Sequence, residues 1–163
     1  MAVDCFLKIG DIKGESTDDK HKEWIEILSY SHGVSQTGSG ARSSGGAASG
    51  ARCDHQDFSV TKVLDTTSPT LNLTCCNGTH IKSVTMELCR ATGNKEKYME
   101  YKLDDVILSS VAIGGSAGGD LPIESVTFNY GKITWNYIQT DHQTGATKGN
   151  VEKYWSLITN KGG

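Results

Sequence analysis

The first 40 residues constrain the fold of this chain most, because they follow the pattern of a strand, a tight turn and a longer strand that leads into a flexible loop. Residues 3–9 alternate apolar and polar side chains with the period of two that is typical of a β-strand. Glycine-containing turns follow at 10–14. A longer strand is predicted over residues 22–34. Its large apolar groups on both faces suit a sheet that is covered on both sides or meets another subunit.

The rest of the chain predicts one short helix among further strands. Ser68 fits an N-cap, Pro69 the first helical position and Gly78 the C-cap. The apolar pattern slips in phase at 104–105 and 131–132, as β-bulges do when they bend long strands. This content predicts an all-β barrel or sandwich. Apolar alternation places the remaining strands at residues 58–63, 81–91, 98–113, 126–137 and 151–159.

Residues 35–52 form a stretch of low complexity between two predicted strands. They include 5 Gly, 5 Ser and 4 Ala, a composition that buries too little area to order itself. A passive linker is one interpretation. However, structureless loops longer than about 12–15 residues are uncommon inside a small domain and are often functional.

Length and charge limit the class of protein. The 163 residues predict a single domain over 1–163, and the net charge of -3 disfavours a nucleic-acid partner. No apolar run approaches the roughly 18 residues of a membrane helix, so we expect no membrane insertion. The N-terminus lacks the pattern of a cleaved signal peptide. We therefore expect synthesis in the cytoplasm and, if the protein is exported, a route that accepts the folded chain.

The sequence offers no constellation of catalytic residues, and we expect no cofactor. Cys53, Asp54 and His55 are the only mixed cluster that could attract a metal, but adjacent residues cannot all point at one ion, so we expect no metal site. The five cysteines are an odd number and are expected to stay reduced, with Cys5 packed as a small apolar residue.

Several segments of the chain resemble one known family. They are residues 1–16, 25–36, 57–62, 106–111 and 124–130, of which 1–16 and 31–36 are the most specific. The sequence is similar over nearly its whole length to the haemolysin-coregulated protein (Hcp) family, the tube protein of the bacterial type VI secretion system. The resemblance implies a two-sheet β-barrel with one short flanking α-helix and the extended Gly/Ser-rich loop.

The same resemblance implies an architectural function. Members form homo-hexameric rings that stack into a tube. A contractile sheath drives this tube, capped by a VgrG-type spike trimer, into a target cell, and small effectors travel protected in the lumen. It implies a protein that is cytoplasmic until assembly and is then secreted without a cleaved signal peptide. The sequence stops soon after its last predicted strand, so we expect a plain tube subunit without a fused toxin domain.

Two sets of residues are predicted to serve this function. Ile25 and Ile27 should be buried, with Ser29 and Ser31 continuing their phase unless a bulge intervenes; a shift near Tyr30 would turn Ser31 toward the ring lumen. The loop is predicted to bridge stacked rings by strand-like pairing. Its contact residues would be Gly38, Ser39, Gly40, Arg42, Ser43, Ser44, Gly45, Gly46 and Arg52.

Two other classes of protein remain as alternatives. The first is a secreted β-sandwich that binds a ligand such as a carbohydrate, with Trp135 and Tyr137 on its binding face. The second is an enzyme, which we rank last because the sequence shows no catalytic constellation.

Overall fold

The computed structural model describes residues 2–36, 52–91, 93–141, 143–144 and 146–163. These residues form a mainly β fold with one helix, which confirms the predicted fold class. Over the same residues, no helix combines the length and apolarity needed to cross a membrane. In chain order the elements are β1 (Val3–Ile9), β2 (Ile25–Glu26), β3 (Ser29–Ser31), β4 (Val34–Ser35), β5 (Asp54–His55), β6 (Phe58–Val63), α1 (Ser68–Asn77), β7 (Ile81–Arg90), β8 (Lys97–Gly114), β9 (Ile123–Asn129), β10 (Lys132–Thr140), β11 (Thr147–Ser156) and β12 (Lys161–Gly162).

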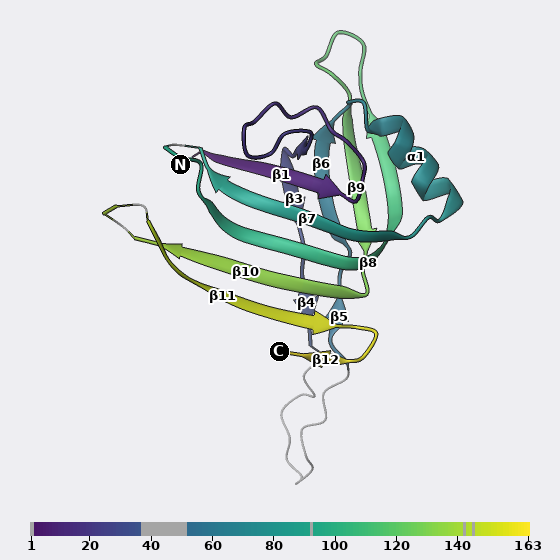
Figure 1. Ribbon diagram of the computed structural model, residues 1–163. Helices are drawn as coiled ribbons and strands as arrows, with labels where there is room; N and C mark the ends of the chain where they lie inside the picture. Colours follow the sequence, from purple (N-terminus) through teal and green to yellow (C-terminus); the bar gives the residue numbers. More distant parts are fainter. Residues whose placement is uncertain (1, 37–51, 92, 142, 145) are drawn as a thin grey trace, which may run out of the picture.

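Two groups of antiparallel strands share the long strand β8. One group has the order β12-β11-β10-β8-β7-β1-β2, and the other has the order β3-β6-β9-β8. Residues 97–106 of β8 pair with β7, whereas residues 107–114 pair with β9. Figure 1 shows the second group crossing behind the first, with the short pair β4-β5 below.

β8 bends from one sheet to the other at the predicted phase slip. Asp105 adopts a left-handed conformation, with φ of 52°, and the Gly131 N–H lies 3.0 Å and 3.1 Å from the carbonyl oxygens of Asp104 and Asp105. Gly131 separates β9 from β10, which pair with the two halves of β8. The single strand predicted over 126–137 is therefore two strands that follow the bend of β8. A Cβ at Gly131 would lie 2.8 Å from Ile158 Cδ1 and 3.1 Å from Asp105 Cβ, so a side chain there would require these neighbours to shift.

The single strand predicted over residues 22–34 is wrong, because this segment crosses from one sheet to the other. Ile25 pairs with Leu7 of β1, and the Ile27 N–H still donates to the Cys5 carbonyl oxygen. The next N–H, of Leu28, donates instead to the Thr61 carbonyl oxygen of β6. The change of partner divides residues 22–34 into β2, β3 and the beginning of β4, and it joins the two sheets at a second corner.

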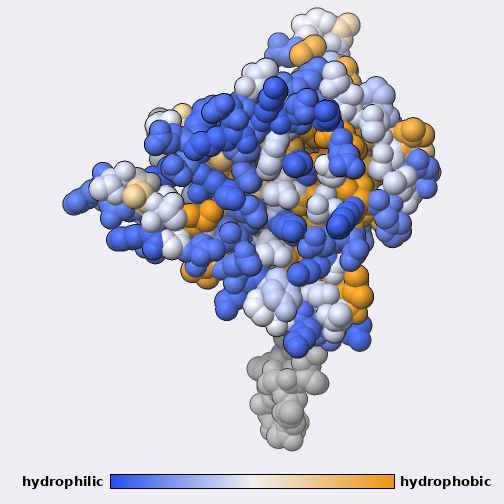
Figure 2. All heavy atoms as spheres, in the orientation of Figure 1, coloured by the Kyte–Doolittle hydropathy of each residue, from blue (hydrophilic) through white to orange (hydrophobic). Residues whose placement is uncertain are grey.

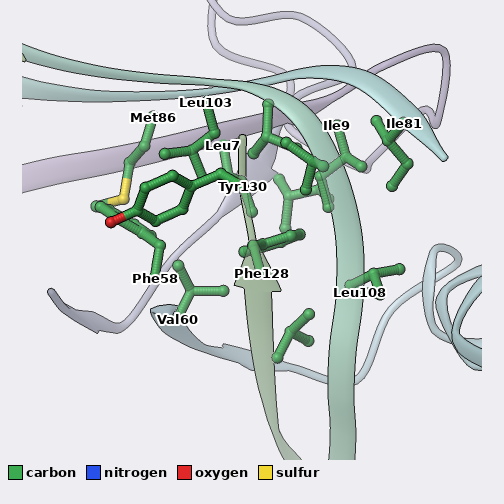
Figure 3. Close-up of a cluster of buried hydrophobic side chains, with 14 of the residues drawn as sticks. Leu7, Ile9, Phe58, Val60, Ile81, Met86, Leu103, Leu108, Phe128 and Tyr130 are labelled. Atoms are coloured by element: carbon green, nitrogen blue, oxygen red, sulfur yellow. The ribbon is translucent and has the colours of Figure 1, made fainter. Parts of the chain in front are cut away.

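The hydrophobic core lies between the two sheets (Figure 3). Alternate residues of each strand point into it, as the sequence pattern predicts. Both sheets contribute; the residues exposed by 2% or less include Leu7, Ile9, Ile25, Phe58, Val60, Met86, Leu103, Leu108, Phe128 and Ile133. Cys5 is half-buried and packs against this cluster as predicted, and all five cysteines are free thiols.

Helix α1 flanks β8 and begins one residue earlier than predicted (Figure 1). Its N-cap is Thr67 rather than Ser68, because the Ser68 hydroxyl is buried and donates to Glu124 of β9. Pro69 lies in the first turn, and Gly78 ends the helix with φ of 64°, as expected. Leu71 is fully buried, so the helix is anchored on the core by its inner face.

Candidate assembly surfaces and buried polar clusters

The predicted inter-ring loop starts from a short two-stranded stem. Val34 and Ser35 of β4 pair with His55 and Asp54 of β5. Arg52 is exposed beside this stem. The other predicted contact residues lie outside the described part of the chain: Gly38, Ser39, Gly40, Arg42, Ser43, Ser44, Gly45 and Gly46.

A cluster of two histidines and a tyrosine anchors the stem to the two sheets, and we call it the stem cluster. The Tyr130 hydroxyl lies 2.7 Å from His32 Nε2 and 3.0 Å from His55 Nδ1, and it donates to the Gln56 carbonyl oxygen at 3.3 Å. Burial raises the pKa of Tyr130 and lowers the pKa of both His32 and His55, because each charged form would lose hydration. The geometry therefore suits neutral rings that share one hydroxyl.

Ser31, the predicted lumen residue, is exposed on β3 opposite Ser59. Ile25 and Ile27 are buried, as predicted. The phase then slips, because the next side chain to face the aromatic core is Tyr30, whose ring lies 6.3 Å from Phe58. Ser31 consequently points away from that core. The slip that the sequence allowed near Tyr30 does occur.

A cleft of about 570 Å³ opens beside β1 and the crossing between β2 and β3. Three leucines on its lining are unusually exposed: Leu28 by 58%, Leu64 by 40% and Leu121 by 67%. The face drawn in Figure 2 is mostly hydrophilic, with apolar groups gathered in patches. Exposed apolar groups that cluster in this way are typical of protein–protein contact surfaces.

β11 offers a second surface for contact, its outer edge. Over the described residues, the edge finds strand partners only near its end, where Trp155 and Ser156 pair with β12 and Tyr154 bonds to Gly163. Unpaired N–H and C=O groups along the preceding residues can extend a sheet into another chain.

A buried ion pair links α1 to β6 and β9. Lys62 Nζ lies 2.5 Å from Glu124 Oε2, 3.0 Å from Asp65 Oδ1 and 3.3 Å from Ser68 Oγ. Lys62 and Glu124 are both 0% exposed. The sequence does carry a signal for this pair, because Lys62 continues the inward phase of Phe58 and Val60.

A second polar cluster lies where residues 10–24 fold over β7. His21 is stacked on Phe6 with ring centroids 4.1 Å apart, and its Nδ1 lies 2.9 Å from Asp18 Oδ2. His21 Nε2 lies 2.6 Å from Glu87 Oε2 and 3.8 Å from Cys89 Sγ. Burial raises the pKa of the Cys89 thiol to about 11. Hydrogen bonds from Lys95 and His21 lower the pKa of Asp18 to about 2.

The sequence pattern gives no sign of this cluster, because His21 lies 66 and 68 residues from its partners. The cluster that the sequence suggested, Cys53, Asp54 and His55, does not converge in this way. His55 of that group turns to Tyr130, while Asp54 is exposed in the stem. Among the described residues, the group of metal-ligating side chains that converges is His21, Glu87 and Cys89.

Trp135 and Tyr137, the residues of the carbohydrate-binding alternative, do not form an open aromatic platform. Trp135 is half-buried against the core, with its ring 6.4 Å from that of His32. Tyr137 is 49% exposed. Nothing in this arrangement favours a sugar-binding face.

Comparison with known proteins gives one consistent family. The family model described as "Type VI secretion system effector, Hcp" matches residues 6–137. The protein hcp1 of Pseudomonas aeruginosa is 40% identical over 162 residues, which cover 98% of each chain.

Solved structures agree with this match. A structure described as that of a type six secretion system protein superposes with a TM-score of 0.93 at 34% identity, covering 99% of this chain and 100% of that one. Hcp1 from Salmonella typhimurium superposes with a TM-score of 0.77 at 28% identity, covering 99% of both chains. A type VI secretion system effector from Yersinia pestis gives 0.76 at 28% identity, over 94% of this chain and 99% of that one.

Proposed function

The chain belongs to the Hcp family of type VI secretion tube proteins, and on this premise we propose that six copies form a ring whose lumen carries small effectors. The observation that carries the proposal is the agreement in fold over 99% of the chain with a solved type six secretion system protein. The family is one of structural, secreted tube proteins, which fits the lack of any recognisable catalytic motif in the sequence.

The ring contact is proposed to bury the cleft of about 570 Å³ with its three leucines. These side chains expose apolar area that a second copy could cover, and the free edge of β11 could extend a sheet between copies. We treat residues 1–163 as one domain, because both strand groups share β8 and one core.

Ring stacking is proposed to use the loop that leaves the β4-β5 stem, with Arg52 at its base. Ser31 is proposed to face the lumen, since it is exposed on β3 and points away from the core. The further partners would be the spike trimer, the contractile sheath and the effectors. The protein would remain cytoplasmic until assembly and would leave the cell as part of the tube, without a cleaved signal peptide.

Light scattering after size exclusion tests the ring directly. We expect a particle of six times the 17.5 kDa mass of the chain, and electron micrographs of the same fraction should show rings. A monomer or dimer at all concentrations would contradict the proposal. Such a result would favour a binding module instead.

A further inference from the structure

We propose that His21, Glu87 and Cys89 form a binding site for a transition-metal ion of the Zn²⁺ type. Their donor atoms Nε2, a carboxylate oxygen and Sγ all lie within 4.8 Å of one another. Imidazole, thiolate and carboxylate are the three ligand types that protein zinc sites use. The side chains come from two segments, the 10–24 segment and β7, so an ion between them would fasten the segment to the sheet.

The hydrogen bonding of His21 gives the first argument for a cation. Both ring nitrogens face carboxylates, Nδ1 at 2.9 Å from Asp18 and Nε2 at 2.6 Å from Glu87. A neutral imidazole has only one N–H, so one nitrogen would then present its lone pair to a carboxylate oxygen. Either a second proton or a metal ion between Nε2 and Glu87 removes this repulsion. Cys89 Sγ, 3.8 Å from Nε2, supplies a third donor that a proton alone does not use.

The surroundings of His21 give the second argument. Asp18 accepts a hydrogen bond at Nδ1 and is itself held by Lys95, with 2.8 Å between Lys95 Nζ and Asp18 Oδ1. A carboxylate on the second nitrogen of a metal-binding histidine fixes the ring orientation and strengthens it as a ligand. Phe6 stacks on the same ring at 4.1 Å and limits its rotation. The imidazole is thus held in place from two directions.

The local charge also favours a cation. Lys97 lies 3.4 Å from Glu87 but only 2.6 Å from Glu100, so its charge is mainly paired elsewhere. Four carboxylates, those of Asp4, Asp18, Glu87 and Glu100, surround the ammonium groups of Lys95 and Lys97, and a second proton on His21 would add only one positive charge. Binding would displace the Nε2 proton and the thiol proton, leaving an imidazole, a thiolate and a carboxylate around the ion.

Only small movements are needed to reach ligand geometry. At a tetrahedral zinc, nitrogen and oxygen ligands lie about 3.3 Å apart and nitrogen and sulfur about 3.6 Å apart, given the usual bond lengths. The present separations are 2.6 Å and 3.8 Å. The Nε2–Oε2 pair must therefore widen by less than 1 Å, and the donor atoms of Glu87 and Cys89, now within 4.8 Å of each other, must come to lie about 3.6 Å apart. Glu87 is the one proposed ligand with solvent access, at 15% exposed, and water could reach the fourth position from its side.

Cobalt uptake by the full chain tests this site. The reduced, metal-free protein should take up one Co²⁺ per chain, with the thiolate-to-cobalt absorption and the intense visible bands of a tetrahedral site, and Zn²⁺ should displace it. Cys89→Ala should abolish the thiolate band, and Glu87→Gln should weaken affinity at least tenfold. Cys76→Ala and Cys53→Ala should leave the thiolate band and the cobalt affinity unchanged, because these thiols lie outside the cluster.

Three results would overturn the proposal. One is wild-type protein that takes up no cobalt and retains no zinc after desalting. Another is a thiolate band that survives Cys89→Ala or disappears in Cys76→Ala or Cys53→Ala. If Cys89→Ala does not fold, circular dichroism will show it; Glu87→Gln, altered at a partly exposed side chain, then decides, and unchanged affinity in that variant rejects the site.

Discussion

Among individual residues, Lys62 and Glu124 are charged groups buried away from water. Their lost hydration costs free energy that contacts within the fold must offset. Both side chains are fully buried; Glu124 Oε2 contacts Lys62 and Ser68 of α1, whereas Glu124 Oε1 has no hydrogen-bond partner among the described residues. Removing one partner of such a pair leaves a buried charge with too few partners. The pair therefore holds β6, β9 and the helix in one relative position.

Glu124→Gln is expected to lower the free energy of unfolding by about 3 kcal/mol, the lower end for a broken buried pair because Asp65 still contacts Lys62. Urea denaturation followed by circular dichroism measures the loss. Lys13→Gln is the matched control: its pair with Glu23 is exposed by 74% and 51%, so the change should cost less than about 1 kcal/mol. Equal losses in the two variants would contradict this account.

Ser31→Gln tests the lumen assignment. A long side chain on the exposed face of β3 should obstruct cargo without disturbing the core, so effector co-purification and secretion should fall while the ring mass stays constant. Ser116→Gln places the same side chain on the exposed β8-β9 turn and should behave like the wild type. Unchanged effector recovery with Ser31→Gln would show that this residue does not face the lumen.

Among the elements, the β4-β5 stem lies between the two main sheets and the small-residue loop. The stem cluster fixes its base, so we expect the fold to tolerate changes beyond the stem. Changes in the loop and changes in the stem should therefore have different effects.

Deletion of residues 39–49 should leave a folded hexamer that no longer stacks or supports secretion. Shortening a surface loop changes its closure cost by only about 0.6 kcal/mol for each halving of its length. Thermal unfolding checks the fold, and electron microscopy with a secretion assay checks assembly. A deletion variant that still forms tubes would mean that the loop is a linker, and one that cannot fold would place it in the core.

The stem cluster should make stability depend on pH. Burial lowers the folded-state pKa of His32 and His55 below the ordinary 6.5, so the unfolded chain binds more protons as the pH falls. The stability that the folded state gains from these two neutral histidines is therefore fully present above pH 6.5. It is lost as the pH falls below that value. Asp54 opposes the shift of His55, whereas His55 adds to that of His32.

Denaturation midpoints at pH 7.5 and pH 5.5 measure this effect. The wild type should lose stability between them, and a variant carrying both His32→Asn and His55→Asn should lose less. His80→Asn changes an exposed histidine outside the cluster and serves as the control. If the double variant loses as much stability as the wild type between these two pH values, His32 and His55 do not cause the pH dependence.

At the scale of the whole molecule, the cleft leucines should determine assembly rather than folding. Leu121→Asp is expected to convert the ring to smaller species, because a carboxylate would be buried at the proposed contact. Leu73→Asp alters a leucine of nearly equal exposure, 63% against 67%, on α1 and outside the cleft. Light scattering should show a loss of mass for the first variant alone. A loss for both variants, or for neither, would place the contact elsewhere.

Local sequence pattern determined most of the long strands, the helix and the bend of β8. The alternation over residues 3–9 predicts β1, and Gly78 ends α1, because both signals act through the conformation of neighbouring residues. Asp104 and Asp105 interrupt a long apolar alternation, and β8 bends there. Ile25 and Ile27 point inward, as their spacing predicts.

Tertiary structure alone decided which segments are partners. The alternation over residues 22–34 is continuous, yet hydrogen bonding changes from β1 to β6 between Ile27 and Leu28 and divides it. His21 meets Glu87 and Cys89 only because residues 10–24 fold over β7. Apolar periodicity indicates which face of a strand is buried, but it does not indicate which distant segment covers that face. Pairing and clustering therefore depend on contacts that form only when the two sheets close around their common core.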